Sequence, residues 1–255
     1  MNSTGGFRRR ATYVKDQRRL AEYVLLLDAG DALVGDGGAE NEAAAEKVIA
    51  GMNLMGYDAM AIGPMELGLG AAGLRELLAR AEFPVLSANA LWRADQQLVG
   101  QPYTIIDAGA YKIGVVGITR LPGEELSDYT VLDPEEVLEE VLTEVREQAD
   151  TVLVLTNIPY RSALDLAGAV GGMDLIVAAL PRQLPSRALR VPKTGTLVLT
   201  AEQPLTGHSG RRIGKLVVRV GGDGRLSEEE WESVALGPGI RDDLRMRLLL
   251  ERYGD

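Results

Sequence analysis

Two carboxylates follow short apolar segments of the sequence, and each stands close to a glycine. Asp31 comes after the apolar run 23–27, in Asp28-Ala29-Gly30-Asp31, and Glu66 follows the run 59–62, in Gly63-Pro64-Met65-Glu66. A side chain at the carboxyl end of a strand lies in the crevice where α/β sheets bind ligands. An aspartate there also commonly caps the following loop. Asp31 is therefore a candidate ligand-binding residue, with a loop cap as the alternative.

Other catalytic chemistries have little support in the sequence. The chain has no cysteine, which excludes disulfides, thiolate catalysis and zinc–thiolate sites. The single histidine, His208, lies in Gly207-His208-Ser209-Gly210, which we interpret as a loop rather than a ligand site. No phosphate-binding loop ending in Gly-Lys-Ser or Gly-Lys-Thr occurs. The glycines at 35, 37 and 38 are expected to form a flexible crevice loop.

Apolar runs alternate along the chain with segments whose apolar residues recur at helical spacing, which predicts a layered α/β fold. The predicted strands are residues 23–27, 59–62, 85–87, 103–106, 112–118, 151–156, 175–179, 196–200 and 215–220. The predicted helices are residues 8–22, 42–55, 74–81, 134–148 and 162–169.

Helix and loop signals refine this prediction. Asp133 before Pro134 is typical of a helix N-cap followed by a first-turn proline. From residue 193 onward the strands follow one another without helices, which predicts an antiparallel section. No linker or repeat divides the chain. We expect one domain over residues 1–222 and a loosely attached acidic tail or helix over residues 223–255.

The overall charge restricts the partners. The chain has 255 residues and a formal net charge of −10, which argues against nucleic acid as a partner. The basic clusters at 8–10 and 18–19 are expected to form a solvated helix face. No stretch of about 18 to 20 apolar residues predicts a membrane span, and the first residues lack the pattern of a signal peptide. The compartment stays unassigned.

The order of these motifs resembles the N-terminal domain of the 5′-nucleotidase family, within the calcineurin-like metallophosphoesterases. The resemblance is carried by Gly30-Asp31, the stretch from Met52 to Ala59, Gly63 to Glu66, and Phe83 to Asn89, and it extends to about Val220. It implies a β-sandwich flanked by helices (α/β/β/α). Residues 5–9 resemble the segment after the family's first strand, so we expect that strand and its Asp-x-His ligands to be missing.

Compared residue by residue, the resemblance implies the loss of most metal ligands. Asp31 matches the aspartate that bridges both metals in active relatives and is the one vestigial ligand. Pro64 and Met65 replace a ligand asparagine and a catalytic histidine. Asn157 replaces a ligand histidine and is a weak candidate for a hard cation. Arg182 lies where the last two histidines are expected and would repel a dication.

Two-metal hydrolysis requires two cations about 3.5 to 4 Å apart, each held by several carboxylate and imidazole ligands. One surviving aspartate cannot offset the dehydration of even one ion. We therefore expect no resident metal cofactor. A projecting Arg182 beside Asp31 could substitute for the metal charge and bind a small anion; the alternative is a surface arginine.

Three functions follow. The leading hypothesis is a degenerate 5′-nucleotidase-like domain without phosphoester hydrolysis that serves as a binding or interaction module. The first alternative is an active phosphoesterase that uses Mn, Zn or Fe to act on nucleotides. The second is a small-anion-binding protein. The vestigial crevice would consist of Asp31, Glu66, Asn89, Asn157 and Arg182.

The expected missing strand has a consequence for partners. Its absence would leave unpaired backbone groups and an uncovered apolar face. We therefore expect a homodimer or a partner protein to cover this edge, and a nucleotide or a small anion is the candidate ligand. The resemblance also implies a family whose members are mostly exported.

Overall fold

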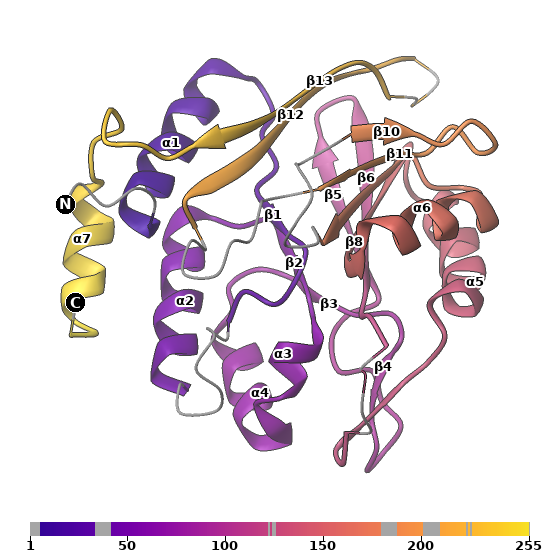
Figure 1. Ribbon diagram of the computed structural model, residues 1–255, viewed down its shortest axis with the longest axis horizontal. Coiled ribbons are helices and arrows are strands. Elements are labelled where there is room, and N and C mark those ends of the chain that lie inside the picture. Colours follow the sequence, from indigo (N-terminus) through magenta and orange to yellow (C-terminus); the bar gives the residue numbers. More distant parts are fainter. Residues whose placement is uncertain are drawn as a thin grey trace.

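The computed structural model describes residues 6–33, 42–121, 123, 126–179, 188–200, 210–222, 224 and 226–254. Two β-sheets lie face to face, and helices cover the outer face of each sheet (Figure 1). This arrangement confirms the layered α/β fold predicted from the sequence. Among the described residues no strand precedes the first helix.

The first sheet is small and parallel. Its strands lie in the order β1 (Leu27–Asp28), β2 (Ala59–Ala61) and β3 (Val85–Leu86). The predicted strand over residues 23–27 is mostly irregular, and only its last residue joins β1. Because parallel strands end at the same edge, the loops after β1 and β2 meet there. These two loops carry the carboxylates singled out from the sequence.

The second sheet has six strands. The order is β10 (Ala188–Arg190), β11 (Leu197–Thr200), β9 (Leu175–Ala179), β8 (Thr151–Pro159), β6 (Tyr111–Ile118) and β5 (Tyr103–Ala108). The four inner strands are parallel, whereas β5 and β10 pair antiparallel at the two edges. The inner strands are apolar runs because both of their faces are covered.

The two sheets meet in an interface of small and branched apolar side chains. Ala59 and Ala61 of β2 pack against Val115 and Leu155 of the second sheet, and all four are fully buried. At Gly117 the two sheets approach closely, since a Cβ there would lie 2.4 Å from the Leu86 Cβ. Glycine at this position lets β3 and β6 pack directly.

The outer layers are helical. Against the first sheet lie α1 (Phe7–Leu20), α2 (Glu42–Met55) and α4 (Gly70–Arg80), and α7 (Leu244–Glu251) packs outside them against α1 and α2. Against the second sheet lie α5 (Pro134–Arg146) and α6 (Tyr160–Ala169). Asp133 caps α5 as predicted, because its side chain accepts hydrogen bonds from the backbone N–H groups of Glu135 and Glu136.

Several short elements have no counterpart in the prediction. The strands β4 (Ala90–Trp92) and β7 (Tyr129–Val131) pair antiparallel beside the two main sheets. Helix α3 (Pro64–Leu67) is a single turn that begins directly after the loop following β2. Each of these elements is too short to show a periodic pattern of apolar residues.

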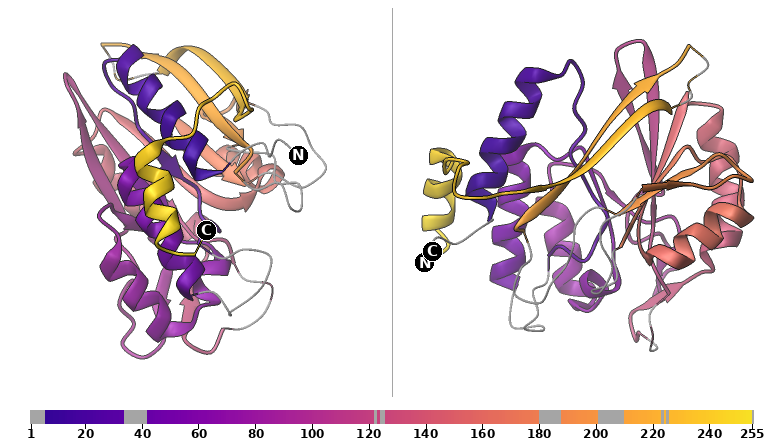
Figure 2. Two further views of the ribbon diagram at one scale, coloured as in Figure 1. Left: turned by 90° about the vertical axis from the view of Figure 1, so that its left-hand side faces the viewer. Right: turned by 45° about the horizontal axis from the view of Figure 1, so that its top comes forward.

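The C-terminal residues are built into the fold. Strands β12 (Arg212–Val220) and β13 (Leu226–Ala235) form an antiparallel hairpin that crosses over the layers (Figure 2). Helix α7 then packs beside α1 and buries Met246 and Leu250. The expectation of a loosely attached tail therefore does not describe residues 226–251, and the sequence-based boundary at residue 222 falls in the turn of this hairpin.

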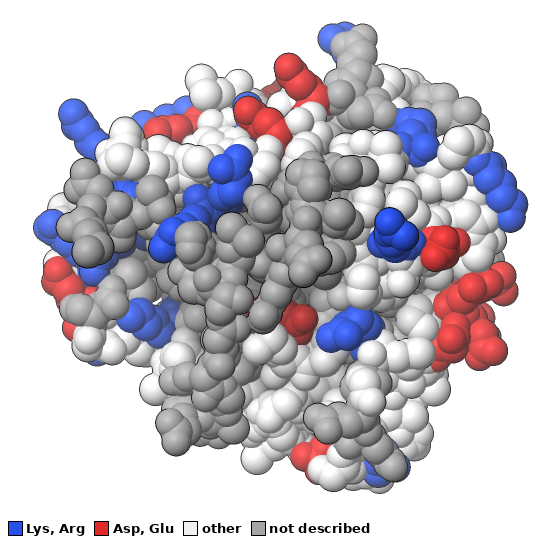
Figure 3. Space-filling view, in the orientation of Figure 1, with Lys and Arg blue, Asp and Glu red and all other residues white. Residues whose placement is uncertain are grey.

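The predicted solvated face does not describe the basic cluster 8–10, because Arg8, Arg9 and Arg10 of α1 are half-buried. On the face shown in Figure 3, Lys and Arg side chains stand in separate groups divided by uncharged and acidic residues. No helix in the described part of the chain is long and apolar enough to cross a bilayer.

Replacing Met246 with alanine is expected to lower the free energy of unfolding by about 2–4 kcal/mol, because loss of a fully buried side chain would leave a cavity. The matched control is Leu248→Ala in the same helix, at a side chain that is 50% exposed, which should change stability by less than about 0.5 kcal/mol. Urea denaturation of both variants checks this. Equal effects would show that α7 is not packed in the core.

Candidate functional site

The site begins at the end of β1, where the chain turns sharply. Gly30 has φ 96° and Asp31 has φ 60°, a left-handed conformation that few non-glycine residues adopt. Ahead of this turn, the Asp28 Oδ1 accepts a hydrogen bond of 3.0 Å from the Gly30 N–H, and burial raises the pKa of Asp28. The turn directs the Asp31 carboxylate toward the loop after β2.

Glu66 fastens this turn in place from within the protein. Its carboxylate is fully buried and accepts three backbone hydrogen bonds. The donors are the N–H groups of Asp31 at 2.8 Å, Leu33 at 2.9 Å and Gly63 at 2.8 Å. The same carboxylate therefore joins the loop after β1 to the loop after β2. Glu66 belongs to the cluster predicted from the sequence, and its side chain is fully buried.

Burial governs the protonation of Glu66. Removal from water raises its pKa to about 7, and the nearby Asp31 carboxylate acts in the same direction. The three backbone N–H donors favour the charged form but only partly offset the burial. Glu66 therefore titrates close to neutral pH in the folded protein.

Hydrogen-bond donors surround the Asp31 carboxylate. The Met65 backbone N–H donates to Oδ1 at 3.0 Å, and the Asn157 side-chain amide donates to Oδ2 at 3.1 Å. Asn157 lies near the end of β8, is only 3% exposed, and accepts at its Oδ1 from the Arg120 N–H at 2.9 Å. The structure thus brings together Asp31, Glu66 and Asn157, three residues that the sequence placed in the crevice.

Gly63 makes this arrangement possible. A Cβ at residue 63 would lie 2.2 Å from the Asp31 Oδ1 and 2.4 Å from the Asn157 Nδ2. Both distances are far inside van der Waals contact, so any larger residue would separate the two side chains. The sequence analysis names Gly63 only as part of a motif. Its position directly after the predicted strand 59–62 is the one sequence signal that could have marked it as a site residue.

Asn89 lies apart from these three residues. It is fully buried, and its amide donates to the backbone carbonyls of Thr119 and Leu132, each at 2.9 Å. Its Oδ1 accepts from the Thr119 N–H at 2.8 Å. Every polar atom of this side chain is therefore used within the protein. Arg182, His208 and the glycines at 35, 37 and 38 lie outside the described residues.

The donor set does not suit a pair of divalent cations. A cation needs several free carboxylate or imidazole ligands, whereas both Asp31 oxygens here accept hydrogen bonds and Glu66 faces inward. Within the described ranges, no group of three or more His, Cys, Asp or Glu residues could hold a metal ion. The described residues therefore do not fit a dinuclear metal centre.

Comparison with known proteins identifies the family. The chain is 33% identical over 183 residues to the snake venom 5′-nucleotidase of Crotalus adamanteus, an alignment that covers 68% of this chain and 31% of that protein. The chain belongs to the 5′-nucleotidase family. No family model matches this 5′-nucleotidase family domain. It spans about a third of the length of the curated relatives that it matches over most of its own length.

Solved structures confirm the fold of this 5′-nucleotidase family domain. The 5′-nucleotidase precursor from Thermus thermophilus superposes with a TM-score of 0.85 at 24% identity, over 99% of this chain and 53% of that chain. The calcineurin-like phosphoesterase YfkN from Bacillus subtilis gives a TM-score of 0.76 at 18% identity, over 99% of this chain and 89% of that one. The predicted resemblance to the N-terminal domain is thus confirmed.

Exchanging Gly63 for alanine is expected to destabilise the protein by about 1–3 kcal/mol, because the added methyl group overlaps Asp31 and Asn157. Gly168→Ala in α6 is the matched control, since a Cβ there meets nothing within 4 Å and alanine favours helix. Thermal and urea unfolding of both variants give the comparison. A neutral Gly63→Ala would contradict the close packing of the three loops.

The stability of the protein should depend on Glu66 as pH changes. Its folded-state pKa of about 7 exceeds the ordinary value of 4.5, so its contribution is fully present below pH 4.5 and is lost as the pH rises through 7. The loss amounts to about 3 kcal/mol. Glu66→Gln should remove this part of the pH dependence of the unfolding free energy, whether or not it changes the stability at any one pH.

The measurement is urea denaturation at half-unit steps from pH 4 to pH 8. Glu139→Gln, at an exposed carboxylate on α5, is the control and should reproduce the wild-type slope. A Glu66→Gln protein whose stability falls with pH as steeply as the wild type would show that another group is responsible.

Proposed function

We propose that this 5′-nucleotidase family domain is a binding or interaction module that does not hydrolyse phosphoesters through a dinuclear metal centre. The proposal rests on the hydrogen bonds of the Asp31 carboxylate. Its two oxygens accept hydrogen bonds from the Met65 backbone N–H and the Asn157 side-chain amide. Each oxygen of this carboxylate therefore uses one acceptor site for a hydrogen bond within the protein. The carboxylate holds three loops together instead of holding metal.

The sequence supports the same proposal from the positions matched to the family. Pro64 offers no side-chain donor atom, and Met65 stands where the resemblance implies a catalytic histidine. Met65 is 38% exposed, and its backbone N–H donates to Asp31. A partly exposed thioether can contact apolar groups but cannot transfer a proton.

An active metal-dependent phosphoesterase is the alternative. The curated relatives are named as 5′-nucleotidases. A nucleotide is therefore the substrate to test for an active phosphoesterase and the ligand to test for a binding module. The small-anion alternative depends on Arg182, which lies outside the described residues. We also propose that a second copy or a partner protein covers the sheet edge beside β1.

A measurement of metal uptake distinguishes the binding module from the metal-dependent phosphoesterase. Protein incubated in turn with Mn²⁺, Zn²⁺ and Fe²⁺ and then desalted should retain close to no metal per chain, and it should release no phosphate from nucleoside monophosphates. The physical reason is that one carboxylate with both oxygens hydrogen-bonded cannot offset the dehydration of a dication.

Two variants make the measurement specific. Asp31→Asn should leave metal content and phosphate release unchanged, as should the exposed control Asp107→Asn on β5. One or two ions per chain that are lost in Asp31→Asn but kept in Asp107→Asn, together with phosphate release, would overturn the proposal and establish the alternative.

A further inference from the structure

Helices α5 and α7 lie on opposite sides of the molecule and expose side chains of opposite charge. Helix α7 packs outside the helices of the first sheet, and α5 covers the second sheet (Figure 1). The two sheets lie between them, so α5 and α7 of one chain do not meet. A contact between these two helices therefore requires two copies of the chain.

The exposed face of α5 is acidic. Leu138, Leu142 and Val145 are buried against the second sheet, so the opposite face of the helix points to solvent. The exposed acidic residues of α5 and its C-cap are Glu135, Glu136, Glu139, Glu140, Glu144 and Glu147. Arg146 is the one basic residue of this helix, and it forms an ion pair with Asp174 at 2.5 Å. Acidic side chains gather on this side of the molecule in Figure 3.

The exposed face of α7 is basic and apolar. Leu244 and Leu248 are 58% and 50% exposed and lie one turn apart. Arg245 and the C-cap Arg252 are also exposed, and neither takes part in an ion pair within the described ranges. The single glutamate of this helix, Glu251, pairs with an arginine of the same helix at 3.8 Å. Positive charge therefore dominates this face.

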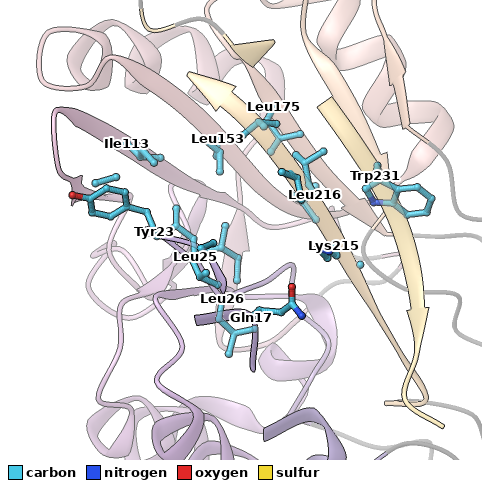
Figure 4. Close-up of a pocket in the computed structure, with 18 of the residues that line it drawn as sticks. Gln17, Tyr23, Leu25, Leu26, Ile113, Leu153, Leu175, Lys215, Leu216 and Trp231 are labelled. Carbon is cyan, nitrogen blue, oxygen red and sulfur yellow. The ribbon is translucent and has the colours of Figure 1, made fainter. Parts of the chain in front are cut away.

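The two leucines of α7 differ from the apolar side chains of the hairpin before it. Leu216 of β12 and Trp231 of β13 point into a cavity between the hairpin and β1 (Figure 4). Leu244 and Leu248 do not line this cavity and face solvent. A contact on the outer face of α7 would remove both leucines from water, which is favourable.

The charged residues of the two helices have the same spacing. Arg245 and Arg252 are seven positions apart, which is about 10.5 Å along a helix and nearly two full turns around it. Glu140 and Glu147 are also seven positions apart. Both C-caps have αR backbone, so the helical spacing extends to them. With the helices side by side, each arginine faces a glutamate in either relative direction, and Leu248 lies between the two pairs.

The net charge of −10 determines the salt concentration at which such a contact forms. Copies of equal net charge repel each other at long range, but about 0.1 M salt screens exposed charges that are more than about 10 Å apart. Ion pairs in direct contact are screened less at this concentration and are strongly weakened toward about 1 M. Short-range complementarity therefore governs the approach of two copies at about 0.1 M salt.

We propose that this chain associates head to tail, with α7 of one copy packed against α5 of the next. Arg245 and Arg252 pair with Glu140 and Glu147 of the next copy, and Leu248 is buried between these pairs. Because the two surfaces differ, each contact leaves one α5 and one α7 free, so association continues beyond a dimer. The proposal goes beyond the proposed function, since neither helix carries a residue of the candidate site.

Sedimentation velocity of the full chain in 0.1 M NaCl tests the proposal. A contact of about two helical turns is at the small end of specific interfaces, so we expect association between about 0.1 and 1 mM protein. The weight-average sedimentation coefficient should rise through this range without a plateau at the value of a dimer. In 1 M NaCl it should return to the value of the monomer, because the ion pairs are screened.

Charge reversal at each surface locates the contact. The α7 variant combines Arg245→Glu with Arg252→Glu, and the α5 variant combines Glu140→Arg with Glu147→Arg. Each should weaken association at least fivefold, because like charges then face each other. An equimolar mixture of the two variants should associate again, since the reversed surfaces are complementary between molecules. This recovery also shows that both variants are folded.

A matched control changes the net charge without touching either helix. Lys112→Glu combined with Lys193→Glu, both at exposed positions, changes the net charge by the same amount as the α7 variant. This control should associate like the wild type. The α5 variant makes the net charge less negative, so weaker association of this variant cannot come from long-range repulsion.

Four results would overturn the proposal. A sedimentation coefficient that is independent of concentration up to about 1 mM would show that the copies do not associate. Equal losses in the α7 variant and the lysine control would attribute the effect to net charge. Association that persists in both helix variants, or a mixture that stays monomeric, would place the contact elsewhere. Binding of the monomer to vesicles of phosphatidylcholine and phosphatidylserine, lost in the α7 variant, would make an anionic membrane the occupant of α7.

The proposed function is tested separately. Its failure would appear as bound metal and phosphate release, whatever the sedimentation coefficient does.

Discussion

A single buried carboxylate holds the candidate site together. Glu66 accepts backbone hydrogen bonds from Asp31, Leu33 and Gly63, so two loops that follow different strands are fixed to one point. A charged group without water needs such donors, and a buried N–H group in turn needs an acceptor. The left-handed turn at Asp31, the direction of its carboxylate and its contact with Asn157 all depend on this fastening.

The main elements could be predicted because their local signals agree with their packing. Helix α5 has a cap at Asp133, a first-turn proline and apolar residues at helical spacing, and the structure confirms it. The inner strands of the second sheet are apolar runs because both of their faces are covered. Strand β13 resembles an acidic tail in sequence, because Ser227 and the three glutamates after it carry no apolar signal.

The site could be predicted in its residues but not in its geometry. Spacing after the strands locates Asp31 and Glu66, yet the contact with Asn157 joins residues 126 positions apart, which no local pattern can reveal. Periodicity also cannot distinguish a carboxylate that faces inward, such as Glu66, from one that faces solvent. The resemblance to the family implies that Asn89 is a crevice residue, whereas in the structure it joins the backbone at Thr119 and Leu132.

Helices α1 and α7 lie far apart in the sequence and complete one layer together. Lys15 of α1 forms an ion pair with Asp243, and the Asp243 N–H donates to the Arg8 carbonyl at 3.0 Å. Met246 of α7 and Val14 of α1 belong to the same apolar cluster. More than 200 residues separate α1 from α7 in the sequence. At about 5–20 residues per second, the ribosome adds them in roughly 10 to 50 seconds, and α7 does not exist before then. The contacts of α1 with Asp243 and Met246 can therefore form only after almost the whole chain has been made, although α1 itself is made before the sheets.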